Sequence, residues 1–257
     1  MGRIEQDRRL AQIVVAMKDE VGATASVNAL TASLNVDIRQ SETYSLPDGH
    51  SAIYNAFVVF NDKGVSLEQL VKLLEVSHFV LQVQAFEGRD GAIFDEISFP
   101  VNWQGRRVVI LSQQATTRMF DAIRSVLGSG GDVLLYQQGS IYGKDLAEFF
   151  VNSLGRDFLQ HNYDYGLHLL AATGWGIPEL NGSQEVFPTI TVRLSSCFEC
   201  EGLTSEREIC SFMRGFLTGV FSTIAGQVVR CEETSCIAKG DSHCKFELHS
   251  GRSTPTW

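Results

Sequence analysis

The sequence predicts an α+β protein with two units: a ferredoxin-like plait expected over residues 1–90, and a second α/β unit expected over residues 91–257. Apolar residues alternate in some segments and recur every three or four positions in others, which indicates strands and helices in one chain. A polar stretch with glycine, Glu87 to Gly91, interrupts these patterns and is the expected linker. All six cysteines follow it, between Cys197 and Cys244, so the second unit is expected to carry its own chemistry.

The predicted elements of the first unit run strand, helix, strand, strand, helix, strand, which is the ferredoxin-like order. Their expected ranges are Gln12–Lys18, Ala23–Leu34, Val36–Ser41, Ala52–Asn61, Leu67–Val76 and His78–Phe86. The strands are rich in Val, Ile and Phe, and the turn-forming run Pro47-Asp48-Gly49 separates the middle pair. Ser66, followed by Glu68 and Gln69, predicts the N-terminal cap of the second helix.

The second unit is expected to begin at Phe99-Pro100 and to mix short strands with helices. The predicted strands are Arg107–Leu111, Val133–Gln137, Phe187–Leu194, Gln227–Glu232 and Cys244–Leu248, and the predicted helices are Thr117–Leu127, Gly143–Asn162, Tyr165–Ala172 and Glu206–Ile224. In the range 143–162, apolar residues such as Leu146, Phe149 and Phe150 recur at helical spacing. The glycine-rich run from Gly128 to Gly131 is expected to separate two elements.

The composition excludes several classes of partner. The formal net charge is −9, and the few basic residues are scattered, which argues against a nucleic-acid backbone as the main partner. No apolar run approaches the roughly 20 residues that a membrane-spanning helix needs. The N-terminal residues lack the pattern of a secretory signal, so a cytoplasmic protein is expected.

The cysteine cluster indicates metal or redox chemistry, because disulfide frameworks are rare in cytoplasmic proteins. Glu233 and Cys236 lie three positions apart at the end of a predicted strand, and Gly240-Asp241 is expected to turn the chain back to Cys244. Zinc needs four ligands at the corners of a tetrahedron. A strand loop supplies two or three of them, and Cys210, near the start of a long predicted helix, is the natural further donor.

The spacing alone leaves other assignments open. Cys197-x-x-Cys200 is a candidate for a zinc knuckle or a redox pair. However, a strand leads into it, and no second pair of this spacing completes four sulfurs. His243 is an alternative to Glu233 as a ligand. The cysteines are also compatible with buried, reduced side chains that act as small hydrophobic groups.

The C-terminal motif resembles the signature of the 4-vinyl reductase domain. The matching residues are Cys210-x4-Gly215-x3-Gly219 and Glu233-x2-Cys236-Ile-Ala-Lys-Gly240-Asp-x2-Cys244-x-Phe246, with Phe99-Pro100, Tyr136-x2-Gly139, Gly174-Trp-Gly176 and Phe198-Glu199-x-Glu201 upstream. The resemblance implies that Cys210, Glu233, Cys236 and Cys244 hold one zinc ion. Such a site has no open corner for water, so the zinc is expected to be structural. The family includes aromatic-hydrocarbon sensor domains and is similar to vesicle-tethering subunits that hold an acyl chain.

The first unit resembles an ACT-type regulatory domain. The resemblance rests on a strand followed by Lys18-Asp19-x-x-Gly22, a helix, and a strand that begins with Asn35-Val36-Asp37-Ile38. It implies a domain that pairs two chains or takes an effector, so a homodimer is expected. A plait that only pairs chains is the alternative.

Gly215 and Gly219, four positions apart on a predicted helix, each cost about 1 kcal/mol of helix stability relative to alanine. Their presence predicts close approach by another helix or by a ligand. Residues expected to line an apolar ligand chamber are Leu194, Phe198, Phe216, Val220 and Cys231, with His168 and Trp175 as upstream candidates. The strand that ends at Leu194 has no tryptophan where phenol-type sensors of the family place one, which disfavours phenol as the ligand.

The leading functional prediction is a non-enzymatic sensor or adaptor that binds a hydrophobic, aromatic or lipid-like small molecule. One alternative is an enzyme or accessory factor in tetrapyrrole or aromatic metabolism, for which His161, Tyr163 and His168 are the candidate titratable groups. Another alternative is an assembly scaffold with a vestigial pocket. Gly128 to Gly131 lacks the spacing and the lysine of a phosphate-binding loop, and no dinucleotide-binding glycine motif is present.

Overall fold

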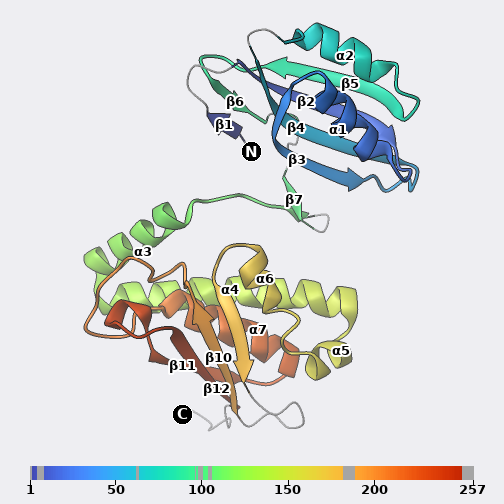
Figure 1. The fold of residues 1–257 in the computed structure, drawn as a ribbon. Coiled ribbons are helices and arrows are strands. Elements are labelled where there is room, and N and C mark those ends of the chain that lie inside the picture. Colours follow the sequence, from blue (N-terminus) through green and yellow to red (C-terminus); the bar gives the residue numbers. More distant parts are fainter. Residues whose placement is uncertain are drawn as a thin grey trace. The chain divides into compact units, whose positions relative to one another are not determined.

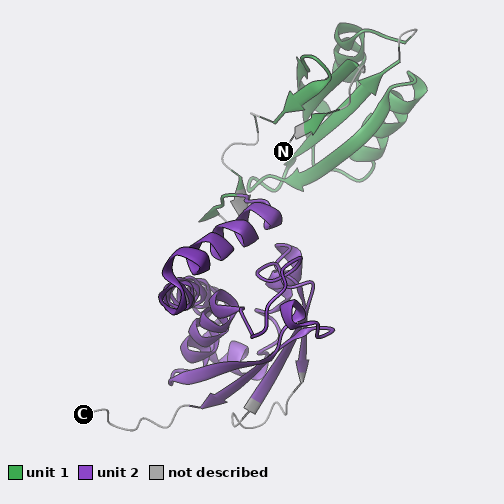
Figure 2. Ribbon diagram, turned by 90° about the vertical axis from the view of Figure 1, so that its left-hand side faces the viewer, with its two compact units in different colours: residues 1–109 green, residues 110–257 purple. Residues whose placement is uncertain are grey.

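The computed structural model describes residues 2–4, 9–61, 64–95, 97, 101–103, 106–181 and 189–250 (Figure 1). The chain forms two compact units, residues 1–109 and residues 110–257 (Figure 2). This boundary lies later than the expected division after residue 90, because β6 (Ala92–Phe94) pairs with β1 (Gly2–Ile4) of the first unit. The predicted linker is therefore the connection between β5 and β6, closed by a bridge between Arg89 and Ala92. The predicted start at Phe99-Pro100 lies outside the described residues.

The first unit has the arrangement that the sequence predicts. Its elements are β2 (Arg9–Lys18), α1 (Ala23–Ser33), β3 (Asp37–Ser45), β4 (Ser51–Phe60), α2 (Leu67–Glu75) and β5 (Val80–Glu87), in an antiparallel sheet of order β3-β4-β2-β5. This is the strand order of a ferredoxin-like plait. The side chain of Ser66 accepts a hydrogen bond from the backbone N–H of Gln69 at 3.2 Å and so caps α2, as predicted.

The core of the first unit lies between its sheet and its two helices. Alternate residues of β2, such as Ile13 and Val15, are fully buried and pack with Val27 of α1 and Leu70 of α2. On the opposite face of the sheet, a smaller apolar cluster contains Ile93 of β6. Both faces of β2 are therefore buried over most of its length, one by the helices and the other in part by the smaller cluster.

The second unit has three layers: an antiparallel sheet, a helix packed on it, and a longer helix packed on that helix. Its elements are α3 (Gln113–Leu127), α4 (Ser129–Leu154), α5 (Arg156–His161), α6 (His168–Ala172), β9 (Ile177–Asn181), β10 (Thr189–Ser195), α7 (Ser211–Ala225), β11 (Val229–Ser235), the short 3-10 helix η1 (Ile237–Lys239) and β12 (Cys244–Ser250). The sheet order is β11-β12-β10-β9. No helix in the described part of the chain has the length and apolar character needed to cross a membrane.

Glycines allow α4 and α7 to touch backbone to backbone. A Cβ atom added to Gly215 would lie 1.9 Å from the carbonyl oxygen of Tyr136, and one added to Gly139 would lie 2.0 Å from the carbonyl oxygen of Phe212. Gly143 and Gly219 are similarly close to the opposing backbone. The close approach that the sequence predicts at Gly215 and Gly219 is therefore made by α4 and not by a ligand.

Several predicted elements differ from the structure. The helix predicted over residues 143–162 is divided at Gly155 between α4 and α5, and the helix predicted over residues 165–172 is shortened to α6. The predicted strand Val133–Gln137 lies inside α4, because α4 already begins at Ser129, directly after Gly128 with its φ of 55°. The short run of apolar residues there belongs to a helix whose glycines are buried against α7. The predicted strand Arg107–Leu111 is reduced to β8 (Arg106–Arg107), which pairs with β7 (Asn102–Trp103). The helix predicted from Glu206 begins at Ser211.

Candidate metal centre

Two parts of the chain deliver the four predicted metal ligands to one place: the start of α7, and the stretch from β11 to β12. Cys210 directly precedes α7, and Glu233 lies on β11. Cys236 directly precedes η1, and Cys244 is the first residue of β12. The ligand atoms of these residues all lie within 4.8 Å of one another. The structure therefore brings together the set of residues that the sequence predicts.

Local hydrogen bonds fix the loop that carries Cys236 and Cys244. Asp241 Oδ2 accepts a hydrogen bond from the backbone N–H of Cys236 at 2.8 Å. Gly240 has a φ of 99°, a left-handed conformation that favours glycine and that turns the chain back toward β12. The backbone N–H of Ile237 points at the sulfur of Cys244 at 3.4 Å. The predicted turn at Gly240-Asp241 is confirmed.

The distances between the donor atoms fit a tetrahedral zinc ion. The sulfur of Cys210 lies 3.8 Å from the sulfur of Cys236 and 3.8 Å from the sulfur of Cys244. Four ligands about 2.3 Å from a zinc ion are about 3.8 Å apart in a regular tetrahedron. Glu233 Oε2 accepts a hydrogen bond from the backbone N–H of Cys210 at 2.8 Å, whereas the buried Oε1 accepts none from the described residues. A buried oxygen without a donor is suited to a cation.

The electrostatics of the site call for positive charge. Burial raises the pKa of Glu233 to about 9, and the neighbouring Cys236 thiolate adds to this rise. Burial also raises the pKa of Cys210. Thiolate and carboxylate ligands must be deprotonated to bind a metal, and a divalent ion reverses the direction of such shifts. The donor set thus fits an ion that compensates the buried negative charge.

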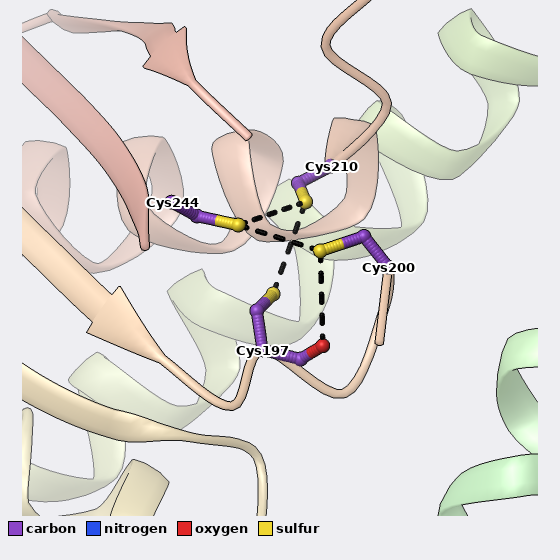
Figure 3. Close-up of side chains that lie close together, drawn as sticks. All are labelled: Cys197, Cys200, Cys210 and Cys244. Atoms are coloured by element: carbon purple, nitrogen blue, oxygen red, sulfur yellow. Dashed lines mark hydrogen bonds between the residues drawn. The ribbon is translucent and has the colours of Figure 1, made fainter. Parts of the chain in front are cut away.

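Cys197 and Cys200 join the same cluster, which the sequence did not predict. The sulfur of Cys197 lies 3.8 Å from that of Cys210, and the sulfur of Cys200 lies 3.3 Å from that of Cys244 (Figure 3). The four sulfurs are within 4.8 Å of one another. The strand that was expected to make the two side chains diverge ends at Ser195. Residues 197–200 form a turn instead, and the two-residue spacing itself was the signal for this convergence.

A buried carboxylate holds this turn against the start of α7. Glu199, between the two cysteines, accepts hydrogen bonds from the backbone N–H groups of Phe212 at 3.0 Å and Met213 at 2.8 Å. It also pairs with the guanidinium group of Arg124 from α3, which in turn donates to the carbonyl oxygen of Ile209 at 2.7 Å. Burial raises the pKa of Glu199 to about 7, although Arg124 acts in the opposite direction. The carboxylate satisfies N–H groups of the first turn of α7 that lack partners within the helix.

A second acidic residue extends this network. Asp132 near the start of α4 lies 3.5 Å from Nε of Arg124 and 2.7 Å from a guanidinium nitrogen of Arg207. Its other partner is the hydroxyl group of Ser211, at 3.3 Å. These contacts connect α3, α4 and the start of α7 around the cysteine cluster.

The predicted ligand-binding residues separate into two groups. Those that are buried in the second unit are Leu194, Phe198, Phe216, Val220 and Cys231. Trp175 is half-buried, and its ring centroid lies 5.1 Å from that of Phe198 and 5.2 Å from that of Phe216. His168 is not part of this group: 76% of its side chain is exposed, and it faces Asp164 at 3.9 Å.

A cavity of about 280 Å³ adjoins the tryptophan and the cysteine loop. Its lining residues are Gln113, Ala171, Gly174, Gly176, Ile177, Ser196 and Glu201. Gly174 and Gly176 flank Trp175, and Ser196 directly precedes Cys197. The sequence did not predict Gln113 or Glu201 as part of a pocket, because α3 and the loop after β10 are far apart in the chain.

Residues 190–250 match the model of the 4-vinyl reductase domain. Two uncharacterized proteins of Methanocaldococcus jannaschii are similar to parts of the chain. One is 32% identical over 59 residues, which are 23% of this chain and 33% of that protein. The other is 26% identical over 132 residues, which are 50% of this chain and 72% of that protein. The chain thus spans about a third of the length of the first relative.

Three solved structures are also similar, each with 18% sequence identity. The phenol-responsive sensory domain of the transcription activator PoxR, with phenol, has a TM-score of 0.47 and is matched over 58% of this chain and 79% of that one. A vinyl-4-reductase family protein from Methanocaldococcus jannaschii has a TM-score of 0.37, with 54% and 92% covered. The ACT domain from GTP pyrophosphokinase of Chlorobium tepidum has a TM-score of 0.27, with 31% and 99% covered.

Proposed function

We propose that this chain, which carries a 4-vinyl reductase domain over residues 190–250, is a non-enzymatic sensor or adaptor for a small hydrophobic or aromatic molecule. A structural zinc ion stabilises the domain that binds the molecule. The observation that carries the proposal is the convergence of Cys210, Glu233, Cys236 and Cys244 on one buried point. These residues would tie the start of α7 to β11 and β12.

The donor set favours zinc in a structural role. Soft thiolate ligands select zinc over calcium or magnesium, and three thiolates with one carboxylate complete a tetrahedron. With four protein ligands, no corner remains for a catalytic water molecule. When bound, the ion compensates the negative charge of its ligands and links the start of α7 to β11 and β12 through coordination bonds. Because that link is absent from the unfolded chain, its binding free energy adds to the stability of the fold.

The aromatic cluster next to the cysteine loop supports a hydrophobic or aromatic ligand. Trp175 is half-buried above Phe198 and Phe216, so one part of its ring system remains available to a ligand. The adjacent cavity of about 280 Å³ is open to solvent and lies just below the usual range of ligand sites, about 300–1,000 Å³. Gln113 and Glu201 would give it a few polar groups for orientation. Leu194 lies beside this cavity, because a Cβ atom added to the lining residue Gly176 would lie 2.8 Å from the side chain of Leu194, whereas Val220 and Cys231 do not line it.

The placement of the titratable side chains favours a sensor over an enzyme. His161 and His168, the histidines considered for catalysis, have 73% and 76% of their side chains exposed. Tyr163 stacks on Phe221 with a ring separation of 5.8 Å, and it does not line the cavity described above. None of these three residues lines that cavity or has a ring contact with Trp175 among the described residues.

The first unit is proposed to pair two chains in a homodimer. Its outer strands are β3 and β5, and they carry the exposed apolar side chains Tyr44, Leu81 and Phe86. Outer strands with exposed apolar groups are natural surfaces for pairing with a second copy. The mass of the protein in solution, measured by light scattering during size-exclusion chromatography, should correspond to two chains.

The proposal is tested by metal analysis and ligand extraction of the purified protein. We expect bound zinc and a co-purifying apolar molecule, both seen by mass spectrometry. Cys236→Ser should release zinc and lower the free energy of unfolding by several kcal/mol, as loss of a structural zinc does. Cys231→Ser is the matched control, because Cys231 is buried on β11 but belongs to neither group of potential ligands. Unchanged zinc in Cys236→Ser would refute the ligand assignment.

The ligand site has its own test. Trp175→Ala should weaken binding of an added aromatic probe such as naphthalene at least tenfold, measured by fluorescence. His168→Ala should leave the affinity unchanged, because the side chain of His168 is 76% exposed and does not line the cavity. Equal affinities in all three proteins would place the ligand elsewhere.

A further inference from the structure

The cysteine cluster contains more donors than one zinc ion can use. Besides the predicted set of Cys210, Glu233, Cys236 and Cys244, a second set of four sulfurs belongs to Cys197, Cys200, Cys210 and Cys244. The two sets share Cys210 and Cys244. Each set alone has the number of ligands that a tetrahedral ion needs. The question is what Cys197 and Cys200 do.

We infer that Cys197 and Cys200 bind a second zinc ion, which the thiolates of Cys210 and Cys244 bridge to the first. The inference rests on the zinc site proposed above and extends it. Two tetrahedra that share an edge need six donors, and the two sets together supply six. A thiolate sulfur has enough lone pairs to bind two metal ions at once, so it can occupy the shared corners.

The distances support a shared edge. The bridging sulfurs of Cys210 and Cys244 are 3.8 Å apart, which matches the edge of a zinc tetrahedron. In the first set the sulfur of Cys236 lies 3.8 Å from that of Cys210. In the second set the sulfur of Cys197 lies 3.8 Å from that of Cys210, and the sulfur of Cys200 lies 3.3 Å from that of Cys244. Figure 3 shows the sulfurs of the second set pointing toward one another.

The second set is held in place by contacts that do not involve metal. Glu199, between Cys197 and Cys200, is fixed by backbone N–H groups of Phe212 and Met213 and by Arg124. Both cysteine side chains are fully buried. A turn that is fixed in this way presents its two sulfurs to the edge formed by Cys210 and Cys244 with little loss of conformational entropy on binding.

The separations between the sulfurs also favour single ions over a cluster that contains inorganic sulfide. In an iron–sulfur cluster, iron and inorganic sulfide separate the cysteines that bind different irons, whereas all four sulfurs of the second set lie within 4.8 Å of one another. The short separations instead fit sulfurs that contact the same ion.

The test is the zinc content of the full-length holoprotein, measured by native mass spectrometry and elemental analysis. We expect two zinc ions per chain in the wild type and in Cys231→Ser, and one in Cys197→Ser and in Cys200→Ser. X-ray absorption of the wild type should show zinc–zinc scattering. Cadmium NMR should show two resonances that are split by coupling through the shared sulfurs. These two spectra need no variant and so do not depend on how the variants fold.

The outcomes separate this inference from the proposed function. One zinc per chain that is lost in Cys236→Ser and kept in Cys197→Ser would overturn the second ion and leave the single structural zinc intact. One zinc that is lost in Cys197→Ser and kept in Cys236→Ser would overturn both. A wild-type protein without zinc would also overturn both.

Discussion

The sulfur atoms of Cys200 and Cys244 lie 3.3 Å apart, although 44 positions separate the two residues in the sequence. Both side chains are fully buried, and neither forms a disulfide in the structure. A disulfide needs two sulfurs that can approach to about 2 Å. We therefore expect Cys200 and Cys244 to be the pair that forms a disulfide first when the metal-free cluster is oxidised.

Mild peroxide treatment of the metal-free protein should therefore produce a disulfide between Cys200 and Cys244. Two thiols lose two protons and two electrons to one peroxide, which becomes two water molecules. Peptide mapping by mass spectrometry identifies the pair. Zinc-loaded protein should react much more slowly, because the ion holds the thiolates. A dominant disulfide that involves Cys231 would contradict the expected order of reactivity.

Zinc binding should release a proton from Glu233. Its pKa of about 9 in the metal-free protein means that the carboxyl is protonated at pH 7, whereas a ligand must be deprotonated. Calorimetry at pH 7 in buffers of different ionisation enthalpy gives the number of protons released when zinc binds. This number should be about one lower for Glu233→Gln than for the wild type. Equal counts would show that Glu233 is already ionised or does not bind the metal.

The same shift has a defined sign for the stability of the metal-free protein. The folded-state pKa of about 9 lies above the ordinary value of 4.5 for a glutamic acid. The folded state therefore binds more protons than the unfolded state between these values, and stability falls as the pH rises through this interval. Urea unfolding of the metal-free protein at several pH values should show a shallower decline for Glu233→Gln.

The ion pair between Arg124 and Glu199 should show strong coupling. Arg124→Met leaves a fully buried carboxylate without its cation, which typically costs about 3–5 kcal/mol of unfolding free energy. The double variant Arg124→Met with Glu199→Gln should be less destabilised than the sum of the two single variants. Arg207→Met is the control and should cost less than about 1 kcal/mol, because 60% of its side chain is exposed. If the losses of unfolding free energy in the two single variants add up to the loss in the double variant, Arg124 and Glu199 do not stabilise the fold through their interaction.

The contact between α4 and α7 should not tolerate a methyl group. Gly215→Ala would place Cβ 1.9 Å from the carbonyl oxygen of Tyr136, so the helices must separate. Overpacking of this kind costs about 1–3 kcal/mol or more. Gly130→Ala is the control: nothing lies within 4 Å of its Cβ position, and alanine favours the helix. The melting temperature of zinc-loaded Gly215→Ala should be lower than that of zinc-loaded Gly130→Ala. Equal melting temperatures would contradict the close contact.

The elements of the first unit could be predicted because each one is specified by a local pattern. The cap at Ser66 and the run of Ile and Val in β2 depend only on residues close by in the chain. In the second unit the run Val133–Gln137 was misassigned, since a short apolar segment fits a strand or a buried helix equally well. Only the glycine contacts with α7, a segment far away in the sequence, decide between the two.

The candidate site was predicted in part for the same reason. The four residues of the C-terminal motif could be identified from their spacing and resemblance. The two-residue spacing of Cys197 and Cys200 indicated a possible zinc or redox pair, but their place in this cluster depends on Glu199, which is held by Arg124 and by the start of α7. His168 was expected near the ligand, but a single histidine in a helical segment does not reveal which way it faces.

Because their backbones touch at four glycines, α4 and α7 have no layer of flexible side chains between them that could absorb a displacement. Tyr142 on α4 and Phe216 on α7 both contact Trp175, so a molecule that pushes on this ring pushes on the two helices together. Cys210 is attached to the first turn of the same block. A molecule that fills the cavity would thus act on the block of helices that begins at Cys210, and a change in the absorption spectrum of the cobalt-substituted protein on addition of ligand would test this coupling.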